Sequence, residues 1–205
     1  MSSSIQSVMK HLFVSFFLLV SVCACSKKDN EPSQTYTVDG PGSKVEWKGS
    51  APDHFHVGAF SVSGEIRRRA GGEIVGGKFK IPIASISNYD LPDEVKPQLL
   101  DHLKSPDFFN MALYPEAAFE IQQVVPYGKA SADTTHTIRG AFTMLGKTNT
   151  ISFPAKIVAE NDNLTTRASF RFDRLKWGMT SYNDPEKGLY ILPEIEIQLD
   201  IRAKK

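Results

Sequence analysis

The chain has 205 residues with 24 Lys and Arg against 23 Asp and Glu, a formal charge of +1. Apolar residues make up 41% and charged residues 23%, which are ordinary values for a globular domain. The near-zero charge lacks the basic excess of a protein that neutralises many phosphates, so we expect no nucleic-acid partner. The two cysteines, Cys23 and Cys25, both lie near the N-terminus, which excludes a disulfide framework, a cysteine zinc site and a cysteine nucleophile in the rest of the chain.

The first residues have the layout of a secretory signal. Residues 12–25 (LFVSFFLLVSVCAC) form an uncharged run of 14, preceded by Lys10 and His11. As a helix this run would span about 21 Å, short of the ~30 Å hydrocarbon core of a bilayer. A buried N-terminal helix is the alternative, but the run is apolar on every face. The sequence therefore predicts a signal peptide over residues 1–24 and no resident transmembrane helix.

The end of this run, Val22-Cys23-Ala24-Cys25, resembles a bacterial lipobox. The resemblance implies cleavage before Cys25 and attachment of acyl chains to it, and each buried CH₂ of such chains contributes about 0.8 kcal/mol to membrane binding. We therefore expect a lipid-anchored protein of the Gram-negative cell envelope, on the periplasmic or surface face of the outer membrane. Ordinary signal cleavage, leaving Cys25 as a free thiol, is the alternative.

A polar segment follows, and then the folded domain. Residues 26–34 (SKKDNEPSQ) contain no apolar residue, so we expect a flexible tether over residues 25–34. Residues 35–205 are expected to form one domain. No feature of the sequence indicates an oligomeric state.

The body of the chain alternates apolar and polar residues with the period of two that is typical of half-buried strands. Phe119, Ile121 and Gln123 share one expected face, and Ile138, Phe142 and Met144 share another. Clusters of Gly, Asn and Asp separate the runs, as tight turns require. We expect strands over residues 44–48, 57–67, 74–83, 117–125, 137–145, 150–158, 165–174 and 194–202.

One segment breaks this pattern. In residues 93–104 (DEVKPQLLDHLK), Val95, Leu99 and Leu103 recur at the spacing of a helical stripe. Pro97 is tolerated only near the first helical turn, and Ser105-Pro106 ends the segment. About eight antiparallel strands and one amphipathic helix predict a mostly β fold, either a closed barrel or a sandwich with a helical cap.

Eight short motifs together resemble the YceI-like family of lipid- and polyisoprenoid-binding proteins, over residues 36–203. The resemblance implies an all-β fold of eight antiparallel strands in a lipocalin-like barrel, with one amphipathic helix and a short helical segment. It also implies a long apolar ligand in the lumen. The motifs are VEWKG at 45–49 with HVG at 56–58, GGKF at 76–79, HLKSPDFF at 102–109, YPEAAF at 114–119, IRG at 138–140, LGKT at 145–148 and FDRLKWG at 172–178.

An eight-stranded barrel has an interior that side chains just fill, or that holds one slender ligand. Both outcomes stay open for the inward residues of this chain. Arg174 with Asp173 could place a guanidinium near a ligand head group, or could form a fold-closing ion pair beside a stacked Trp177. The predicted ligand-binding residues are Trp47, Phe60, Phe79, Ile81, Phe119, Ile138, Phe142, Met144, Phe153, Phe170, Phe172, Arg174 and Trp177.

His54 and His56 flank Phe55 and would share a face in an extended segment, with Asp53 beside them. A metal pair is one interpretation and hydrogen bonding in the surface or core is the other. A third ligand at a defined spacing is missing, so we expect no metal and no cofactor.

The leading hypothesis is a non-enzymatic, membrane-anchored carrier whose partner is a long-chain lipid or isoprenoid. A structural or interaction lipoprotein with a packed barrel is the second hypothesis. A metal-assisted lipid-modifying enzyme that uses His54, His56 and Asp53 is the third.

Overall fold

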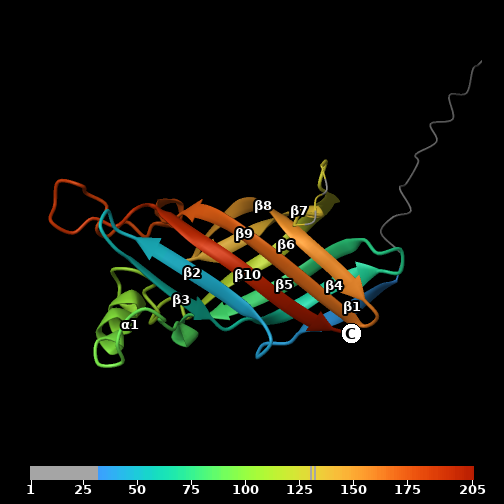
Figure 1. Ribbon diagram of the computed structural model, residues 1–205, viewed down its shortest axis with the longest axis horizontal. Helices are drawn as coiled ribbons and strands as arrows, with labels where there is room; N and C mark the ends of the chain where they lie inside the picture. Colours follow the sequence, from blue (N-terminus) through green and yellow to red (C-terminus); the bar gives the residue numbers. More distant parts are fainter. Residues whose placement is uncertain (1–31, 130, 132) are drawn as a thin grey trace, which may run out of the picture. The chain divides into compact units, whose positions relative to one another are not determined.

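The computed structural model of the protein describes residues 32–129, 131 and 133–205. These residues form ten strands, one α-helix and two 3₁₀ turns (Figure 1). The strands are β1 (Ser33–Val38), β2 (Lys44–Ser50), β3 (Phe55–Phe60), β4 (Ser63–Arg69), β5 (Ile74–Pro82), β6 (Glu116–Pro126), β7 (His136–Met144), β8 (Lys147–Glu160), β9 (Asn163–Asp173) and β10 (Glu194–Lys204). The helix is α1 (Lys96–Lys104), and the turns are η2 (Ile83–Ser85) and η3 (Arg174–Trp177).

The ten strands make a closed barrel of eight because two of its strands are interrupted. β1 and β2 follow one another along the same edge of β10, where Thr37 pairs with Lys204 and Val45 with Leu199. β3 and β4 pair in turn with β2 and β1. All these pairs are antiparallel, and the pairing of β1 with β10 closes the ring. The predicted mostly β, eight-stranded antiparallel barrel is confirmed.

The barrel has two different ends (Figure 1). β2, β5, β7 and β9 finish at the end where α1 lies, which we call the α1 end. β1 begins and β10 finishes at the opposite end, which we call the base. The described chain therefore starts and finishes at the base.

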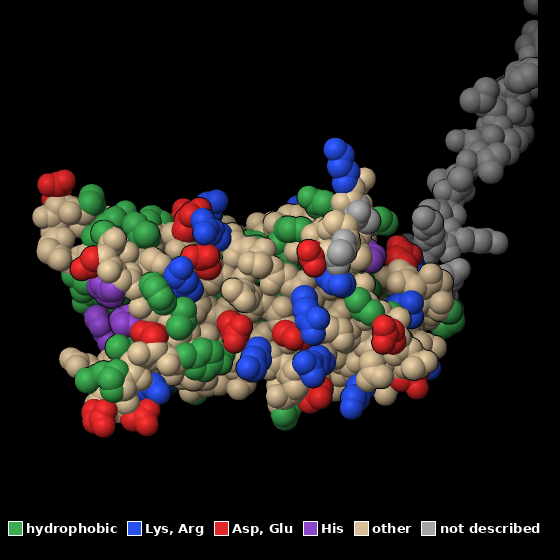
Figure 2. Space-filling view, viewed as in Figure 1, with side chains coloured by type: hydrophobic (Ala, Val, Ile, Leu, Met, Phe, Trp, Pro, Cys, Tyr) green, Lys and Arg blue, Asp and Glu red, His purple; other side chains and the backbone are tan. Residues whose placement is uncertain are grey.

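The alternation of side chains places apolar groups inside and charged groups outside. On β10, Ile197 and Ile201 are buried, whereas Gln198 and Arg202 are exposed. Charged residues of both signs spread over the outer wall in the view of Figure 2. Several form cross-strand ion pairs, such as Lys48 with Glu196 at 3.2 Å. Such pairs contribute little each, so burial of the inner face is the main source of stability.

Two hairpin turns use left-handed backbone conformations. Leu145 and Gly146 have φ angles of 52° and 69° and connect β7 to β8. Two successive residues with positive φ make the turn whose twist matches that of paired strands. Between β8 and β9, Asn161 alone has a positive φ, of 52°. The turn signals at Gly146 and Asn161 therefore mark hairpins, whereas Gly76 and Gly77 lie inside β5.

The predicted inward face of β6 is wrong at Gln123. The pairing of β6 with β7 shifts between Ile121 and Gln123, which is a β-bulge. The extra residue reverses the alternation, so Gln123 is exposed and Val124 packs against the core. A bulge adds one residue to one strand only, and the apolar pattern of the sequence does not mark it.

Helix α1 begins later than predicted, at Lys96 instead of Asp93. Val95 is 43% exposed and does not belong to the buried stripe, whereas Leu100 and Leu103 pack against the core. Pro97 lies in the first turn, where its missing N–H costs no hydrogen bond. In the described part of the chain, no helix has the length and apolar character needed to cross a membrane.

The predicted N-terminal segments stand apart from the described fold. The signal peptide and Cys25 lie outside the described residues. Of the predicted tether, Ser33 and Gln34 belong to β1, where they pair with Arg69 and Arg68. Backbone pairing orders these two polar residues, although nothing apolar in them predicts a strand.

Candidate functional site: an apolar lumen

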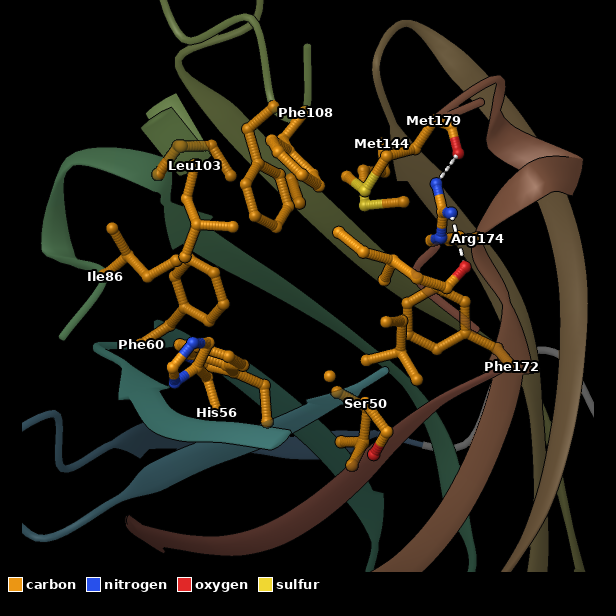
Figure 3. A pocket seen from close by; sticks show the side chains of 18 of the residues that line it. Ser50, His56, Phe60, Ile86, Leu103, Phe108, Met144, Phe172, Arg174 and Met179 are labelled. Carbon is orange, nitrogen blue, oxygen red and sulfur yellow. Dashed lines mark hydrogen bonds between the residues drawn. The ribbon is translucent and has the colours of Figure 1, made fainter. Parts of the chain in front are cut away.

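The inward side chains leave a cavity of about 240 Å³ at the α1 end of the barrel, which we call the outer cavity (Figure 3). Strand residues form its wall, and residues of α1 and of the loops on either side of it cover it. Exposed His54 and Leu189 lie at its rim. It is lined by Val45, Trp47, Gly49, Ser50, Ala51, His54, His56, Phe60, Ile81, Ile83, Ile86, Leu99, His102, Leu103, Phe108, Phe109, Ala117, Phe142, Met144, Phe172, Arg174, Met179, Leu189, Ile191, Ile195 and Ile197.

A second cavity of about 100 Å³, the inner cavity, extends the lumen toward the base. It shares Val45, Ile81, Phe142, Phe172 and Ile197 with the outer cavity, so the two are neighbouring parts of one lumen. Together they reach the lower end of the ~300–1,000 Å³ range of small-molecule sites. The other residues of the inner cavity are Val62, Ile66, Ile74, Phe79, Phe119, Ile121, Ile138, Ile151, Phe153, Ile157, Thr166, Phe170, Leu199 and Ile201.

Aromatic rings form much of this wall. Phe153 and Phe170 stack with centroids 4.2 Å apart and planes 11° from parallel. Phe142 meets Phe172 edge to face at 5.6 Å. Such ring pairs stabilise the wall by about 0.5–1.5 kcal/mol each beyond their burial. The lumen therefore offers a fixed apolar surface to a ligand.

The structure brings twelve of the thirteen predicted ligand-binding residues together around the lumen. Some line the outer cavity, namely Trp47, Phe60, Ile81, Phe142, Met144, Phe172 and Arg174. The inner cavity is lined by Phe79, Phe119, Ile138, Phe153 and Phe170, and again by Ile81, Phe142 and Phe172.

Trp177 lines neither cavity. Its side chain is 1% exposed, its indole Nε1–H donates to the carbonyl of Phe142 at 3.0 Å, and its ring packs on Phe142 and Phe172. Trp177 therefore packs behind the lumen wall and supports it. The spacing of residues in the sequence cannot distinguish such a supporting residue from one that lines the lumen.

Arg174 borders the outer cavity, but its hydrogen bonds go to the backbone. The 1% exposed guanidinium donates from Nε to Leu192 O, from Nη1 to Met179 O and Ser181 O, and from Nη2 to Ile191 O. Burial lowers the pKa of Arg174 below its usual range. The side chain thus fixes the loop that follows η3.

The ion pair expected between Asp173 and Arg174 is absent from the described contacts. The Asp173 carboxylate instead accepts the N–H of Leu175 at 2.9 Å and caps η3. Arg174 instead joins the two sides of the loop after η3 through carbonyl oxygens.

Sequence reasoning missed the cover of the outer cavity. Leu99, Leu103, Phe108 and Phe109 come from α1 and the loop after it. Their helical and aromatic pattern was visible, but only tertiary packing decides that it faces the lumen. Met179 and Ile191 lie in a loop without periodicity, so no pattern in the sequence predicts that they line the cavity.

Three histidines line the outer cavity, and each contacts an aspartate. His54 Nδ1 lies 2.7 Å from Asp53 Oδ1, and His102 Nε2 lies 2.9 Å from Asp107 Oδ2. His56 forms the third pair, described below. Histidine side chains gather at this end of the molecule in Figure 2.

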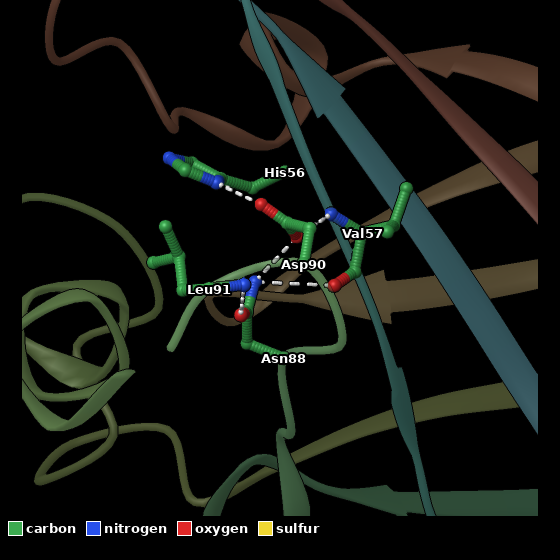
Figure 4. Close-up of polar contacts among 5 residues, drawn as sticks. All are labelled: His56, Val57, Asn88, Asp90 and Leu91. Carbon is green, nitrogen blue, oxygen red and sulfur yellow. Dashed lines mark hydrogen bonds and ion pairs between the residues drawn. The ribbon is translucent and has the colours of Figure 1, made fainter. Parts of the chain in front are cut away.

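His56 and Asp90 belong to a hydrogen-bond network that joins β3 to the loop before α1 (Figure 4). Asp90 Oδ2 lies 2.7 Å from His56 Nδ1, and Asp90 Oδ1 accepts from Val57 N–H and from Asn88 Nδ2, both at 2.8 Å. Burial alone would raise the pKa of Asp90, but the hydrogen bonds from Val57, His56 and Asn88 outweigh it and hold the pKa below its usual range. Asp90 is therefore an ionised acceptor that fixes the His56 ring.

The described residues contain no cluster of three His, Cys, Asp or Glu side chains arranged to hold a metal ion. The suggested metal pair of His54 and His56 therefore gains no third ligand in this part of the chain. The two rings instead contact each other edge to face, with centroids 5.6 Å apart.

Comparisons with known proteins agree with this architecture. A family model described as the YceI-like domain matches residues 36–203. BcnA of Burkholderia cenocepacia is similar in structure, with a TM-score of 0.67 and 20% identity, covering 82% of this chain and 99% of its own. A polyisoprenoid-binding domain of Saccharophagus degradans has a TM-score of 0.62 and 10% identity, covering 82% and 97%.

A YceI protein of Campylobacter jejuni has a TM-score of 0.55 and 14% identity, covering 99% of this chain and 93% of its own. At these identities the solved structures support the fold alone. The comparison with curated proteins found no match.

Proposed function

Because the chain belongs to the YceI-like family, we propose that it binds and carries a long-chain apolar lipid of polyisoprenoid type in the barrel lumen, without catalysing a reaction on it. The observation that carries this proposal is the lumen itself. Its two neighbouring cavities are lined almost throughout by aromatic and aliphatic side chains, and polar groups are confined to the outer one apart from Thr166.

The energetics of burial support the proposal. Covering ~400 Å² of an alkenyl chain contributes on the order of 10 kcal/mol at about 25 cal/mol per Å². Ordering a flexible chain and restricting its translation offset much of this gain. Micromolar or tighter binding is therefore within reach from apolar contacts alone.

A structural neighbour adds support at the level of the family. The Saccharophagus degradans domain of the same architecture is a polyisoprenoid-binding domain. An elongated ligand of this kind matches a lumen whose two parts lie one behind the other along the barrel.

The proposal includes attachment to a membrane of the Gram-negative cell envelope through acyl chains on Cys25. Its support is the lipobox-like sequence alone. Labelled palmitate should enter the wild-type chain and not Cys25→Ser, and the variant should leave the membrane fraction. Equal labelling of both proteins would contradict the anchor.

The binding test uses the full chain purified from its native membrane. Denaturing extraction and mass spectrometry should release a long-chain lipid in near-stoichiometric amount. Ala117→Phe should release far less, because Ala117 is 4% exposed and lines the outer cavity. The matched control is Ala118→Phe, since neighbouring residues of a strand face opposite sides.

An empty lumen in the wild-type protein, with a defined crosslinked protein partner, would favour the packed structural lipoprotein instead. Equal lipid content in Ala117→Phe and Ala118→Phe would show that the ligand lies outside the lumen.

A further inference from the structure

Two polar groups of the outer cavity have opposite hydrogen-bonding roles. They are the imidazole of His56 and the indole of Trp47, and both line this cavity. His56 is labelled in the view of Figure 3.

Asp90 determines which nitrogen of His56 is the acceptor. An ionised carboxylate only accepts hydrogen bonds, so His56 Nδ1, 2.7 Å from Asp90 Oδ2, carries the hydrogen. In the neutral ring, Nε2 is then an acceptor. It lies on the side of the ring away from Asp90 (Figure 4), and it has no hydrogen-bond partner among the described residues.

Trp47 supplies the complementary donor. Its side chain belongs to a residue that is 8% exposed, and the indole Nε1–H is buried without a hydrogen-bond partner in the described part of the chain. Indole is a donor only. A buried donor left unpaired is destabilising, so a ligand atom that accepts from it gains affinity.

The sheet register brings these two groups together. Trp47 on β2 pairs with Gly58 on β3, and the next pair on the same face is Gly49 with His56. Trp47 and His56 are therefore diagonal neighbours, a spacing that aromatic side chains can bridge. Both side chains therefore lie on the inward face of two paired strands, in the same part of the outer cavity.

We propose that this pair recognises the hydroxyl group of a long-chain alcohol, which donates to His56 Nε2 and accepts from Trp47 Nε1–H. This inference rests on the proposed function, because the hydrocarbon chain of the alcohol occupies the lumen. Asp90 acts as a positioning residue that fixes the donor and acceptor roles of the histidine ring.

The charges around the outer cavity disfavour an anionic head group. Asp90 lies directly behind His56, and Asp53 and Asp107 are the partners of the other two histidines. The guanidinium of Arg174 borders the same cavity, but four backbone carbonyls accept its N–H groups. A neutral hydroxyl avoids repulsion by the aspartates and meets both His56 and Trp47.

The test measures the affinity of the delipidated full chain for four probes with one C20 isoprenoid chain: the alcohol, its methyl ether, the carboxylic acid and the hydrocarbon. The alcohol should bind tightest, and about tenfold tighter than the ether, which keeps the acceptor but lacks the donor, as expected for one net hydrogen bond.

Two variants separate the two contacts. His56→Leu should reduce the affinity for the alcohol to that for the ether and leave the hydrocarbon unchanged. Trp47→Phe should weaken alcohol and ether together relative to the hydrocarbon. His136→Gln, a change at a histidine that lines neither cavity, should leave the order of the probes intact.

Binding of all four probes with equal affinity, tightest binding of the acid, or an alcohol preference that survives His56→Leu would overturn the head-group inference and leave lumen binding intact. Failure of every probe, the hydrocarbon included, would overturn the proposed function itself.

Discussion

At the scale of single residues, Arg174 stands out as a cation buried without a carboxylate among its hydrogen-bond partners. Its donors reach carbonyls on both sides of the loop that follows η3, namely those of Met179, Ser181, Ile191 and Leu192. Met179 and Ile191 also line the outer cavity. The guanidinium thereby couples loop conformation to the shape of the lumen.

Replacing Arg174 by Met should lower the free energy of unfolding by about 3 kcal/mol, because several buried carbonyls lose their donors together. Arg174→Lys should recover part of this loss, since an ammonium cannot reach all four oxygens. Urea unfolding measures both values. Wild-type stability in both variants would contradict this role.

His136, near the base, gives the protein a pH dependence separate from the lumen. Its Nδ1 lies 2.7 Å from Thr135 Oγ1, and burial lowers its pKa below the usual 6.5. The unfolded chain then binds the proton more readily than the folded one. Stability should therefore be complete above pH 6.5 and decrease as the pH falls below it.

Urea unfolding from about pH 8 to about pH 5 tests this dependence across the titration of histidine. His136→Gln should flatten the decrease, and the exposed control His54→Gln should not. An unchanged slope in His136→Gln would assign the dependence to another group.

At the scale of elements, the strands could be read from the sequence because one face of each is buried and the other is wet. That pattern holds on β7, where Ile138 and Met144 are buried and Arg139 is exposed. The bulge at Gln123 and the interruptions within β1/β2 and β3/β4 could not be read, since they depend on pairing with a neighbouring strand.

The candidate site also has a part that the sequence predicts and a part that it does not predict. The phenylalanines that line the lumen from the strands follow from alternation along single strands. His56 and Asp90 are 34 positions apart, and no local pattern brings them together. Local periodicity therefore decides the strand wall of the site, and tertiary contacts decide its polar groups and its apolar cover.

The loop before α1 is held against β3 at a glycine. Ser87 N–H donates to Ala59 O and Tyr89 N–H to Val57 O, both at 2.9 Å. A Cβ added at Gly58 would lie 1.8 Å from Ser87 O. Only glycine therefore permits this close approach, which also places Asp90 beside His56.

Gly58→Ala should push the loop outward and lower the free energy of unfolding by about 1–3 kcal/mol, as overpacking commonly does. It should also abolish the alcohol preference, because Asp90 moves away from His56. Gly71→Ala is the matched control, since a Cβ there meets nothing within 4 Å. Thermal unfolding and the probe series measure the two effects, and equal behaviour of the two variants would contradict the role of Gly58.

At the scale of the whole molecule, the ligand proposed for the lumen should raise the free energy of unfolding of the barrel. A ligand that binds only the folded state stabilises it by about 2.7 kcal/mol at a free concentration of 100 Kd. Removing the lipid should lower Tm by roughly 5–10 °C for a domain of this size. Adding the C20 alcohol to delipidated protein should restore it.

The shift should be absent in Ala117→Phe, whose outer cavity is filled, and present in Ala118→Phe. Calorimetry of both variants, each with and without lipid, measures this shift in Tm. A Tm that does not respond to lipid in the wild-type protein would indicate that the lumen is not the binding site.

Both ends of the described chain lie at the base, and the outer cavity lies at the α1 end. An attachment made at either end of the described chain therefore starts from the base, at the opposite end of the barrel from the outer cavity. Under the proposed function, the lipid enters and leaves at the α1 end, on the side away from such an attachment. Immobilised copies of this protein should consequently keep their full exchange rate, a property of direct use in a sensor for lipids.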